Sequence, residues 1–189
     1  MLFSLDSPIR DNYDEIEKLI METSPVMTLD PEALRSAMRA WSAGVTVVTA
    51  VHEGEMHGMT VNSFTSISLT PPLLIISLQQ HTRTHELVMK SQAFGLTILS
   101  ADQIEISDLF AGRMPEVEDR IAAVKTETLV TGSPLIVGGL ALLDCRVVQT
   151  YDAGKTTLFI AEAVAARGTG SGEPLIYHNR EYWKLAHLK

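Results

Sequence analysis

The chain has 189 residues, 46% hydrophobic and 20% charged, a composition that argues against a disordered, collagen-like or coiled-coil protein. Its net charge of −8, from 15 basic and 23 acidic residues, argues against a surface that binds nucleic acid. No apolar run approaches the roughly 20 residues of a transmembrane helix, and residues 1–10 do not resemble a secretory signal. We therefore expect a cytoplasmic protein that does not enter a membrane.

The one cysteine, Cys145, excludes an internal disulfide and a cysteine-based zinc site, and this fits a reducing compartment. Because Cys145 lies in an apolar segment, we expect a buried small hydrophobic side chain rather than a nucleophile.

Residues 1–29 are predicted to form an acidic extension, since the first 30 residues carry seven acids against two bases. The extension is predicted to be partly helical from the i, i+3, i+4 spacing of Ile16, Leu19 and Ile20. The domain itself is predicted over residues 30–189 and opens with a helix over residues 31–42. Asp30 is a good N-cap, and Pro31 suits the first helical position. The apolar stripe of this helix consists of Leu34, Ala37, Met38 and Trp41.

Short strands and turns dominate the rest of the chain. Apolar and β-branched runs predict strands over residues 45–51, 56–62, 73–78, 94–99, 140–151 and 156–165, and a last strand within residues 174–185. Short helices are predicted over residues 84–91 and 102–110, and the polar residues 113–133 are predicted to be irregular. Many short strands with few short helices favour a mainly β fold with short helices, arranged as a β-barrel.

Several common catalytic motifs are missing from the sequence. It has no Gly-rich phosphate loop of the Walker or dinucleotide type and no Gly-x-Ser-x-Gly nucleophile motif. His81 and His85 are four residues apart, but no glutamate follows His81, and we interpret both as part of a partly exposed polar face. We therefore predict no metal site.

Residues 57–84 are the richest in groups that bind ligands. Alternation along a strand is expected to place Thr60, Asn62 and Phe64 on one face, and Val61, Ser63 and Thr65 on the other. Such hydroxyl groups and backbone N–H groups can hold a flat ligand and its phosphate, with Arg83 as the single cation. An ordinary Ser/Thr-rich edge strand explains the same composition, and the residues alone leave both interpretations open.

A series of short motifs runs through about residues 30–187. In chain order, the series consists of Ser42-Ala43-Gly44-Val45-Thr46-Val47-Val48-Thr49, Gly58-Met59-Thr60, Phe64-Thr65-Ser66, Pro71-Pro72-Leu73, Arg83-Thr84-His85, Phe94-Gly95, Leu99-Ser100, Phe110-Ala111-Gly112, Leu143-Asp144-Cys145-Arg146 and Pro174-Leu175-Ile176-Tyr177. Taken together, these motifs resemble the small flavin reductases, which are the reductase components of two-component flavin-dependent monooxygenases.

The resemblance implies an FMN-binding split β-barrel that forms a homodimer. It also implies an NAD(P)H:flavin oxidoreductase, which reduces FMN or FAD with hydride from NADH or NADPH and supplies reduced flavin to a partner monooxygenase. The cofactor carries such a reaction, so no catalytic side chain is expected. The flavin-binding positions implied by the resemblance are Thr60, Val61, Asn62, Ser63, Phe64, Thr65, Ser77, Leu78, Thr82, Arg83 and Thr84.

One position departs from the family pattern. Similar reductases have a Gly-Asp-His turn whose histidine contacts the nicotinamide cofactor, and this chain has Lys155 where that histidine is expected. Lys155, His178 and Arg180 are the residues expected to contact the nucleotide. The missing histidine also permits a flavin-binding protein without reductase activity. A split-barrel protein for another flat ligand, such as haem, is a third interpretation, and the few histidines disfavour it.

Overall fold

The structure, a computed structural model, describes residues 29–168 and 170–186. The chain divides into two units, residues 1–38 and 39–189. The predicted acidic extension lies almost entirely outside the described residues. No helix in the described ranges is long and apolar enough to cross a membrane.

Helix α2 (Pro31–Met38) belongs to the first unit. The Glu32 amide donates to Asp30 Oδ1 at 3.0 Å, as the predicted N-cap requires. The predicted end at residue 42 is wrong, because the helix stops at Met38 and residues 43–44 extend into a strand. Pairing of Ala43 with Tyr177 of strand β11 (Ile176–His178) draws the chain into an extended conformation after the turn at residues 39–40.

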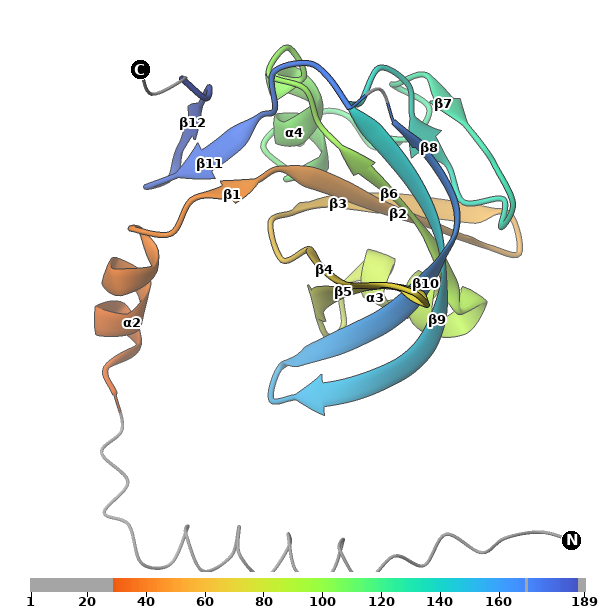
Figure 1. Ribbon diagram of the computed structural model, residues 1–189, viewed down its shortest axis with the longest axis horizontal. Helices are drawn as coiled ribbons and strands as arrows, with labels where there is room; N and C mark the ends of the chain where they lie inside the picture. Colours follow the sequence, from red (N-terminus) through yellow and green to blue (C-terminus); the bar gives the residue numbers. More distant parts are fainter. Residues whose placement is uncertain (1–28, 169, 187–189) are drawn as a thin grey trace, which may run out of the picture. The chain divides into compact units, whose positions relative to one another are not determined.

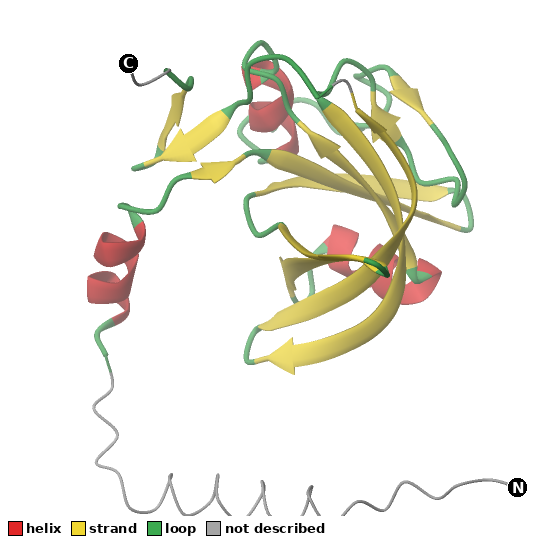
Figure 2. Cartoon of the chain, in the orientation of Figure 1, coloured by secondary structure: helices red, strands yellow, loops and turns green. Residues whose placement is uncertain are grey.

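A seven-stranded antiparallel sheet forms most of the second unit. Figures 1 and 2 show that its long strands curve around one another. Its strands are β2 (Thr46–His52), β3 (Glu55–Val61), β4 (Thr65–Leu69), β5 (Pro72–Gln79), β6 (Ala93–Ile98), β9 (Ala141–Ala153) and β10 (Thr156–Gly168). Their order across the sheet is β3-β2-β6-β9-β10-β5-β4. The two outer strands, β3 and β4, follow each other in the chain but do not pair, so the curved sheet stays split between them. The mainly β prediction and the split barrel are confirmed.

Local sequence explains most of these strands. The β-branched run in β2 forms a hairpin with β3 around Glu53 and Gly54, whose φ angles are +50° and +83°. Positive φ at both central residues is the geometry of a two-residue type I′ turn, which matches the twist of the strands.

Three segments differ from the prediction. The Ser/Thr-rich residues after the predicted strand 56–62 form a separate edge strand, β4. The region predicted to be irregular contains β7 (Thr126–Glu127), which pairs with β8 (Leu135–Ile136). The last predicted strand is instead a hairpin of β11 (Ile176–His178) and β12 (Glu181–Trp183), because Asn179 and Arg180 take positive φ angles and reverse the chain. Strand β1 (Ala43–Gly44) pairs with β11 to complete a three-stranded sheet.

Two helices cover the two faces of the β2–β3 hairpin. Helix α3 (Arg83–Ser91) contributes Leu87 and Val88 to the core cluster that contains Val48 of β2. Helix α4 (Ile104–Phe110) contributes Leu109 and Phe110 to the cluster that contains Val47. The hairpin is therefore held rigidly from both sides, and its end at Val61 leads directly into the site described below.

Cys145 is fully buried, as predicted. Burial raises the pKa of its thiol to about 12, so the thiolate that a nucleophile needs does not form near neutral pH.

Candidate functional site

A groove of about 530 Å³ lies where the sheet is split. It is bounded by the residues before β2, by the connection from β3 to β4 with the first residue of β4, by two positions of β5 and by one of β10. The lining residues are Trp41, Ser42, Ala43, Gly44, Asn62, Ser63, Phe64, Thr65, Ile75, Ser77 and Leu158. None of these eleven side chains is ionisable. The groove is thus an uncharged site with apolar walls and a few hydroxyl and amide groups, which suits a flat ring with polar edges.

The connection from β3 to β4 gives the groove its shape. Residues 62–64 belong to no strand, and the Ser63 hydroxyl donates to the Ser77 carbonyl oxygen at 2.7 Å. The Ser77 amide lies 3.4 Å from the same hydroxyl oxygen. The predicted alternation of faces is therefore wrong after Val61, because the backbone turns away from the strand. As a result, Asn62, Ser63, Phe64 and Thr65 all line the groove.

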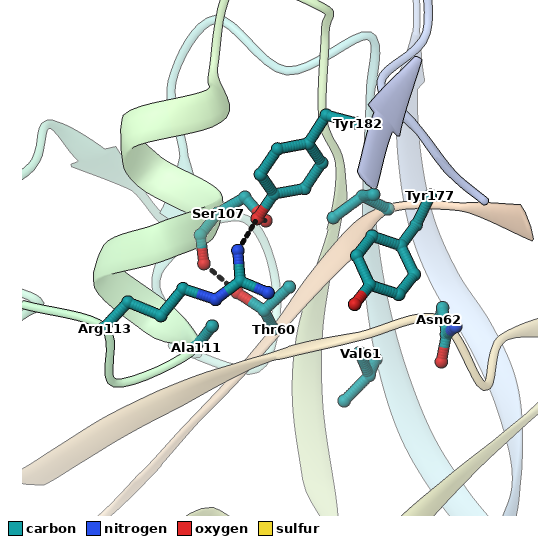
Figure 3. Close-up of a pocket in the computed structure, with 9 residues that line it drawn as sticks. Thr60, Val61, Asn62, Ser107, Ala111, Arg113, Tyr177 and Tyr182 are labelled. Carbon is teal, nitrogen blue, oxygen red and sulfur yellow. Dashed lines mark hydrogen bonds between the residues drawn. The ribbon is translucent and has the colours of Figure 1, made fainter. Parts of the chain in front are cut away.

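A smaller cavity of about 170 Å³ adjoins the groove, and Asn62 lines both. Figure 3 shows its residues converging from β3, from α4 and the loop that follows, and from the β11–β12 hairpin. The lining residues are Val45, Thr60, Val61, Asn62, Ser107, Ala111, Arg113, Tyr177 and Tyr182.

A hydrogen-bonded cluster forms one side of this cavity. The Tyr182 hydroxyl donates to Asp108 Oδ1 at 2.7 Å and lies 2.8 Å from Ser107 Oγ. Arg113 Nη1 donates to Asp108 Oδ1 at 2.6 Å and to the Tyr182 hydroxyl at 3.2 Å. Thr60 Oγ1 donates to the Ser107 carbonyl oxygen at 2.7 Å. Burial raises the pKa of Tyr182, and the hydrogen bond from Arg113 to Asp108 raises the pKa of Arg113. Tyr182 is therefore neutral and Arg113 charged near neutral pH.

Thr82, Arg83 and Thr84 lie at the N-terminus of α3, outside the groove lining. Thr82 is the N-cap, with its hydroxyl 3.4 Å from the His85 amide. Arg83 forms a 2.8 Å ion pair with Glu55, so the predicted single cation is paired. Thr84 is buried, and its hydroxyl lies 2.8 Å from His57 Nδ1.

A third cavity, of about 310 Å³, lies beside the Arg83–Glu55 pair. It is lined by Gly54, Glu55, Met56, His57, Gly58, Arg83, Glu118, Asp119, Arg120 and Ile121. Desolvation by burial, together with the charges of Arg83 and Arg120, lowers the pKa of His57. The side chain of Leu78, another predicted site residue, is buried in the core.

The three residues expected to contact the nucleotide lie outside the lining of all three cavities. Lys155 is in the β9–β10 turn, where its carbonyl oxygen accepts from the Gln80 amide at 3.0 Å. Arg180 is in the β11–β12 turn. His178 Nδ1 lies 2.9 Å from Ser42 Oγ, so His178 holds a residue of the groove without lining it.

His81 is exposed and His85 is partly buried, which agrees with the predicted partly exposed polar face, and His85 also makes structural contacts. Its Nε2 lies 3.0 Å from Thr157 Oγ1, and its ring meets Phe159 edge-on with centroids 5.6 Å apart. Desolvation by burial lowers the pKa of His85, which therefore favours the neutral ring.

Sequence reasoning missed several lining residues. In the groove these are Trp41, Ser42, Ala43, Gly44, Ile75 and Leu158, and in the small cavity Val45, Ser107, Ala111, Arg113, Tyr177 and Tyr182. Two signals were available. The motif series already contained Ser42, Ala43, Gly44, Val45, Ala111 and Tyr177, and an apolar ring with a polar tip, as in the two tyrosines, is common in ligand sites.

The similarity to known proteins covers the second unit of the chain, residues 39–189, almost completely. The family model described as a flavin reductase like domain matches residues 38–186. The reductase component of a 4-nitrophenol 4-monooxygenase/4-nitrocatechol 2-monooxygenase from Rhodococcus opacus is 33% identical over 162 residues, which cover 86% of this chain and 85% of that protein. An NADH-dependent flavin reductase from Rhodococcus sp. is 35% identical over 164 residues, covering 83% of this chain and 90% of its own.

The fold is also similar to solved structures. The flavin reductase PheA2 in its native state superimposes with a TM-score of 0.77 at 36% sequence identity. The similarity covers 84% of this chain and all of that one.

Proposed function

Because the chain belongs to the flavin reductase like family, we propose that it is an NADH-dependent flavin reductase that reduces FMN or FAD. The observation that carries the proposal is the uncharged groove of about 530 Å³ at the split of the sheet. A bound flavin accepts a hydride from reduced nicotinamide, and the protein contributes binding and orientation rather than acid–base chemistry.

The residues present fit a flavin ring. Trp41, Phe64, Ile75 and Leu158 offer apolar surface to its faces, and no side chain of the groove lining carries a charge. Polar atoms of Asn62, Ser63, Thr65 and Ser77 lie among these walls and can meet the hydrogen-bonding edge of the ring. Gly44 leaves room beside them, since a Cβ added there would have no atom within 4 Å.

A site for the flavin phosphate is available just after the end of strand β5, which lines the groove with Ile75 and Ser77. Strand β5 passes from Ser77 to Gln79, and Thr82 then caps α3. The first N–H groups of a helix and its dipole favour a phosphate group. We therefore assign the phosphate to Thr82, Arg83 and Thr84, with Arg83 shared between the phosphate and Glu55.

The product of the proposed reaction is reduced flavin that leaves the protein. A groove of hydroxyl, amide and apolar groups without a cation binds its ligand less tightly than a charged cage would. Modest affinity suits a protein that passes reduced flavin to a separate monooxygenase, and the Rhodococcus opacus relative is named as the reductase component of a monooxygenase.

We propose that the protein forms a homodimer, because exposed edge strands with large apolar side chains are usually covered by another protein surface. Strand β4 exposes Ile67 and Leu69, with Leu69 88% exposed, and β9 beyond residue 146 pairs only with β10 and exposes Val148 and Tyr151. Uncovered edges with large apolar side chains mark contact surfaces. Light scattering at micromolar concentration should give twice the chain mass of 20.7 kDa, and a monomer would contradict the proposal.

We also propose that the protein is cytoplasmic. Cys145 is a buried thiol without a disulfide partner, which suits a reducing compartment.

Oxidation of NADH and NADPH in air, with and without added FMN or FAD, tests the function. Flavin-dependent oxidation that is faster with NADH is the expected result. Absence of oxidation by a protein that still binds flavin would favour the second candidate, a flavin-binding protein without reductase activity. The specific observation for that candidate is Lys155, which stands where similar reductases have a histidine.

A further inference from the structure

The groove has two walls that are held in different ways. Residues 62–65 form one wall, and the hydrogen bond between Ser63 and Ser77 holds it against β5. Residues 41–44 form the other wall, and they belong to no strand of the seven-stranded sheet. Figure 1 shows β1, which contains two of them, beside β11 of the C-terminal hairpin. The position of this second wall therefore depends on the hairpin.

The hairpin is a firm support, because its first strand is fixed to the core. Leu175, directly before β11, is 1% exposed and belongs to the core cluster that contains Val47. Its amide donates to the Leu99 carbonyl oxygen at 3.1 Å, and its carbonyl oxygen accepts from the Val45 amide at 3.0 Å. Tyr177 packs against the same cluster. A group that β11 holds is thus held against the body of the domain.

One side-chain hydrogen bond joins the second wall to the hairpin. The pairing of Ala43 with Tyr177 places Ser42 opposite His178 in the antiparallel register. Ser42 Oγ lies 2.9 Å from His178 Nδ1, within the usual range of a hydrogen bond. Within the described part of the chain, no other side chain of residues 41–44 makes a hydrogen bond. Ser42 is therefore the groove residue that the hairpin holds by a side chain.

His178 is itself held from the second strand of the hairpin. The Trp183 indole nitrogen donates to the His178 carbonyl oxygen at 3.2 Å. The two rings meet edge-on with their centroids 5.9 Å apart, a favourable geometry for an aromatic pair. The imidazole that faces Ser42 is therefore oriented before a ligand enters the groove.

The bond to His178 also determines what Ser42 offers to a ligand. No side chain that lines the groove is ionisable, so hydroxyl and amide groups meet the polar edge of a bound ring. A serine hydroxyl has one donor and two acceptor sites, and it rotates to suit its partners. Because His178 uses one of these sites and fixes the direction of the hydroxyl, the remaining sites are preorganised for the ring.

We propose that His178 is a positioning residue of the flavin groove, which holds Ser42 and with it the wall of residues 41–44 in the shape that accepts the ring. His178 does not line the groove and acts only through Ser42. This role rests on the proposed function, since it takes the ligand of the groove to be flavin. It also differs from contact with the nucleotide, because Nδ1 faces Ser42 and only Nε2 is left for a nucleotide.

Two amide variants separate the two ring nitrogens of His178. The amide group of asparagine lies as many bonds from Cβ as Nδ1 does, whereas that of glutamine reaches the place of Nε2. His178→Asn should keep the bond to Ser42 and the wild-type dissociation constant of FMN and FAD. His178→Gln should lose the bond, so that this constant rises about two- to tenfold, the range of one hydrogen bond between neutral groups. The KM for flavin should rise by the same factor with little change in kcat.

Ser42→Ala removes the other partner of the bond. It should weaken flavin binding at least as much as His178→Gln, because Ser42 also lines the groove. Combining the two substitutions should add nothing to Ser42→Ala alone, since both remove the same bond. His52→Gln is the matched control, because His52 ends β2 and lines none of the three cavities. This control should keep the wild-type flavin constants.

Flavin titration and thermal unfolding of each variant also identify the results that would overturn the assignment. A lower melting temperature of His178→Gln with an unchanged flavin dissociation constant would make the bond purely structural, and additive effects of the two substitutions would separate His178 from Ser42. A KM for NADH raised in His178→Asn but not in His178→Gln would place Nε2 on the nucleotide instead.

Two further comparisons keep the test decisive. If His178→Gln does not fold, His178→Phe should show the same rise, because it keeps a ring against Trp183 and has no nitrogen. A wild-type protein that binds neither FMN nor FAD would overturn the proposed function and this inference with it. Flavin binding by the wild type that the loss of the His178 nitrogen leaves unchanged would overturn the inference alone.

Discussion

Removing the Ser63 hydroxyl should loosen the groove without filling it. Ser63 Oγ donates to the Ser77 carbonyl oxygen at 2.7 Å and lies 3.4 Å from the Ser77 amide, and both residues line the groove. Ser63→Ala deletes one oxygen and adds no bulk. The connection from β3 to β4 then loses the bond that holds it against β5, so the groove is less often in the shape that binds flavin.

The size of the effect follows from the two contacts. A hydrogen bond between neutral groups contributes about 1 kcal/mol net, and the 3.4 Å contact lies beyond the usual range and adds little. If the whole loss falls on the groove, the flavin dissociation constant rises about fivefold, because 1.4 kcal/mol is a factor of ten. The same loss lowers the melting temperature by about 2–4 °C for a chain of this size.

Flavin titration followed by fluorescence, together with thermal unfolding, measures both quantities. Ser66→Ala is the matched control, because Ser66 is an exposed serine of the adjoining strand β4 and does not line the groove. A flavin dissociation constant within twofold of wild type, despite the expected drop in melting temperature, would refute the reasoning. It would mean that the Ser63–Ser77 bond stabilises the sheet and does not shape a flavin site.

Three other outcomes follow from the structure. Replacing Asn62 or Thr65 by phenylalanine places a ring in the groove and should weaken flavin binding about tenfold or more in the same titration, as expected for overfilling a packed site. Asp144→Asn should lower the free energy of unfolding in urea by about 2–4 kcal/mol, because the buried carboxylate accepts hydrogen bonds from the Val130 and Thr131 amides at 2.6 and 2.8 Å. Because burial depresses the pKa of His57 below its ordinary 6.5, the unfolded chain binds the proton more tightly, and stability falls as the pH drops below about 6.5. His57→Gln should therefore lose less free energy of unfolding than wild type between pH 7.5 and 5.5, and an equal loss would contradict this cause.

The strands could be predicted because their causes are local. β2 is a β-branched run, and Gly54 readily takes the positive φ angle of the turn after it, so the hairpin follows from neighbouring residues. The end of α2 could not be predicted in this way. The apolar stripe continues to Trp41, whereas the chain leaves the helix after Met38 and Ala43 pairs with Tyr177, a partner that local periodicity does not reveal.

The polar residues of the groove could be predicted from the sequence, whereas the backbone break that brings them together could not. Asn62, Ser63 and Thr65 stood out as a dense group of polar side chains, and the structure brings them into one groove with Ser77. The break after Val61 depends on a bond between residues 14 positions apart, so serine and threonine in that segment suited a strand and a turn equally well. The roles assigned to Lys155, His178 and Arg180 stay predictions, since these residues line none of the three cavities.

The Arg113 cluster had no local pattern at all. Arg113 and Tyr182 are 69 residues apart, and Ser107 and Tyr182 are 75 apart. Only the packing of the C-terminal hairpin against α4 brings them together. A cavity assembled from such distant segments has no periodicity or spacing for sequence reasoning to detect.

The split of the sheet connects the fold to the proposed activity. Strands β3 and β4 end the sheet on opposite sides although only residues 62–64 separate them, so each keeps one edge whose backbone groups no strand uses. Pairing the two edges would close the barrel and remove the groove. The Ser63–Ser77 bond instead holds the connection against β5, which leaves an uncharged gap beside free N–H and C=O groups. A flat ring with a hydrogen-bonding edge can fill that gap and satisfy those groups. It can also leave, because the ring meets no cation and Arg83, which we assign to the phosphate, is shared with Glu55.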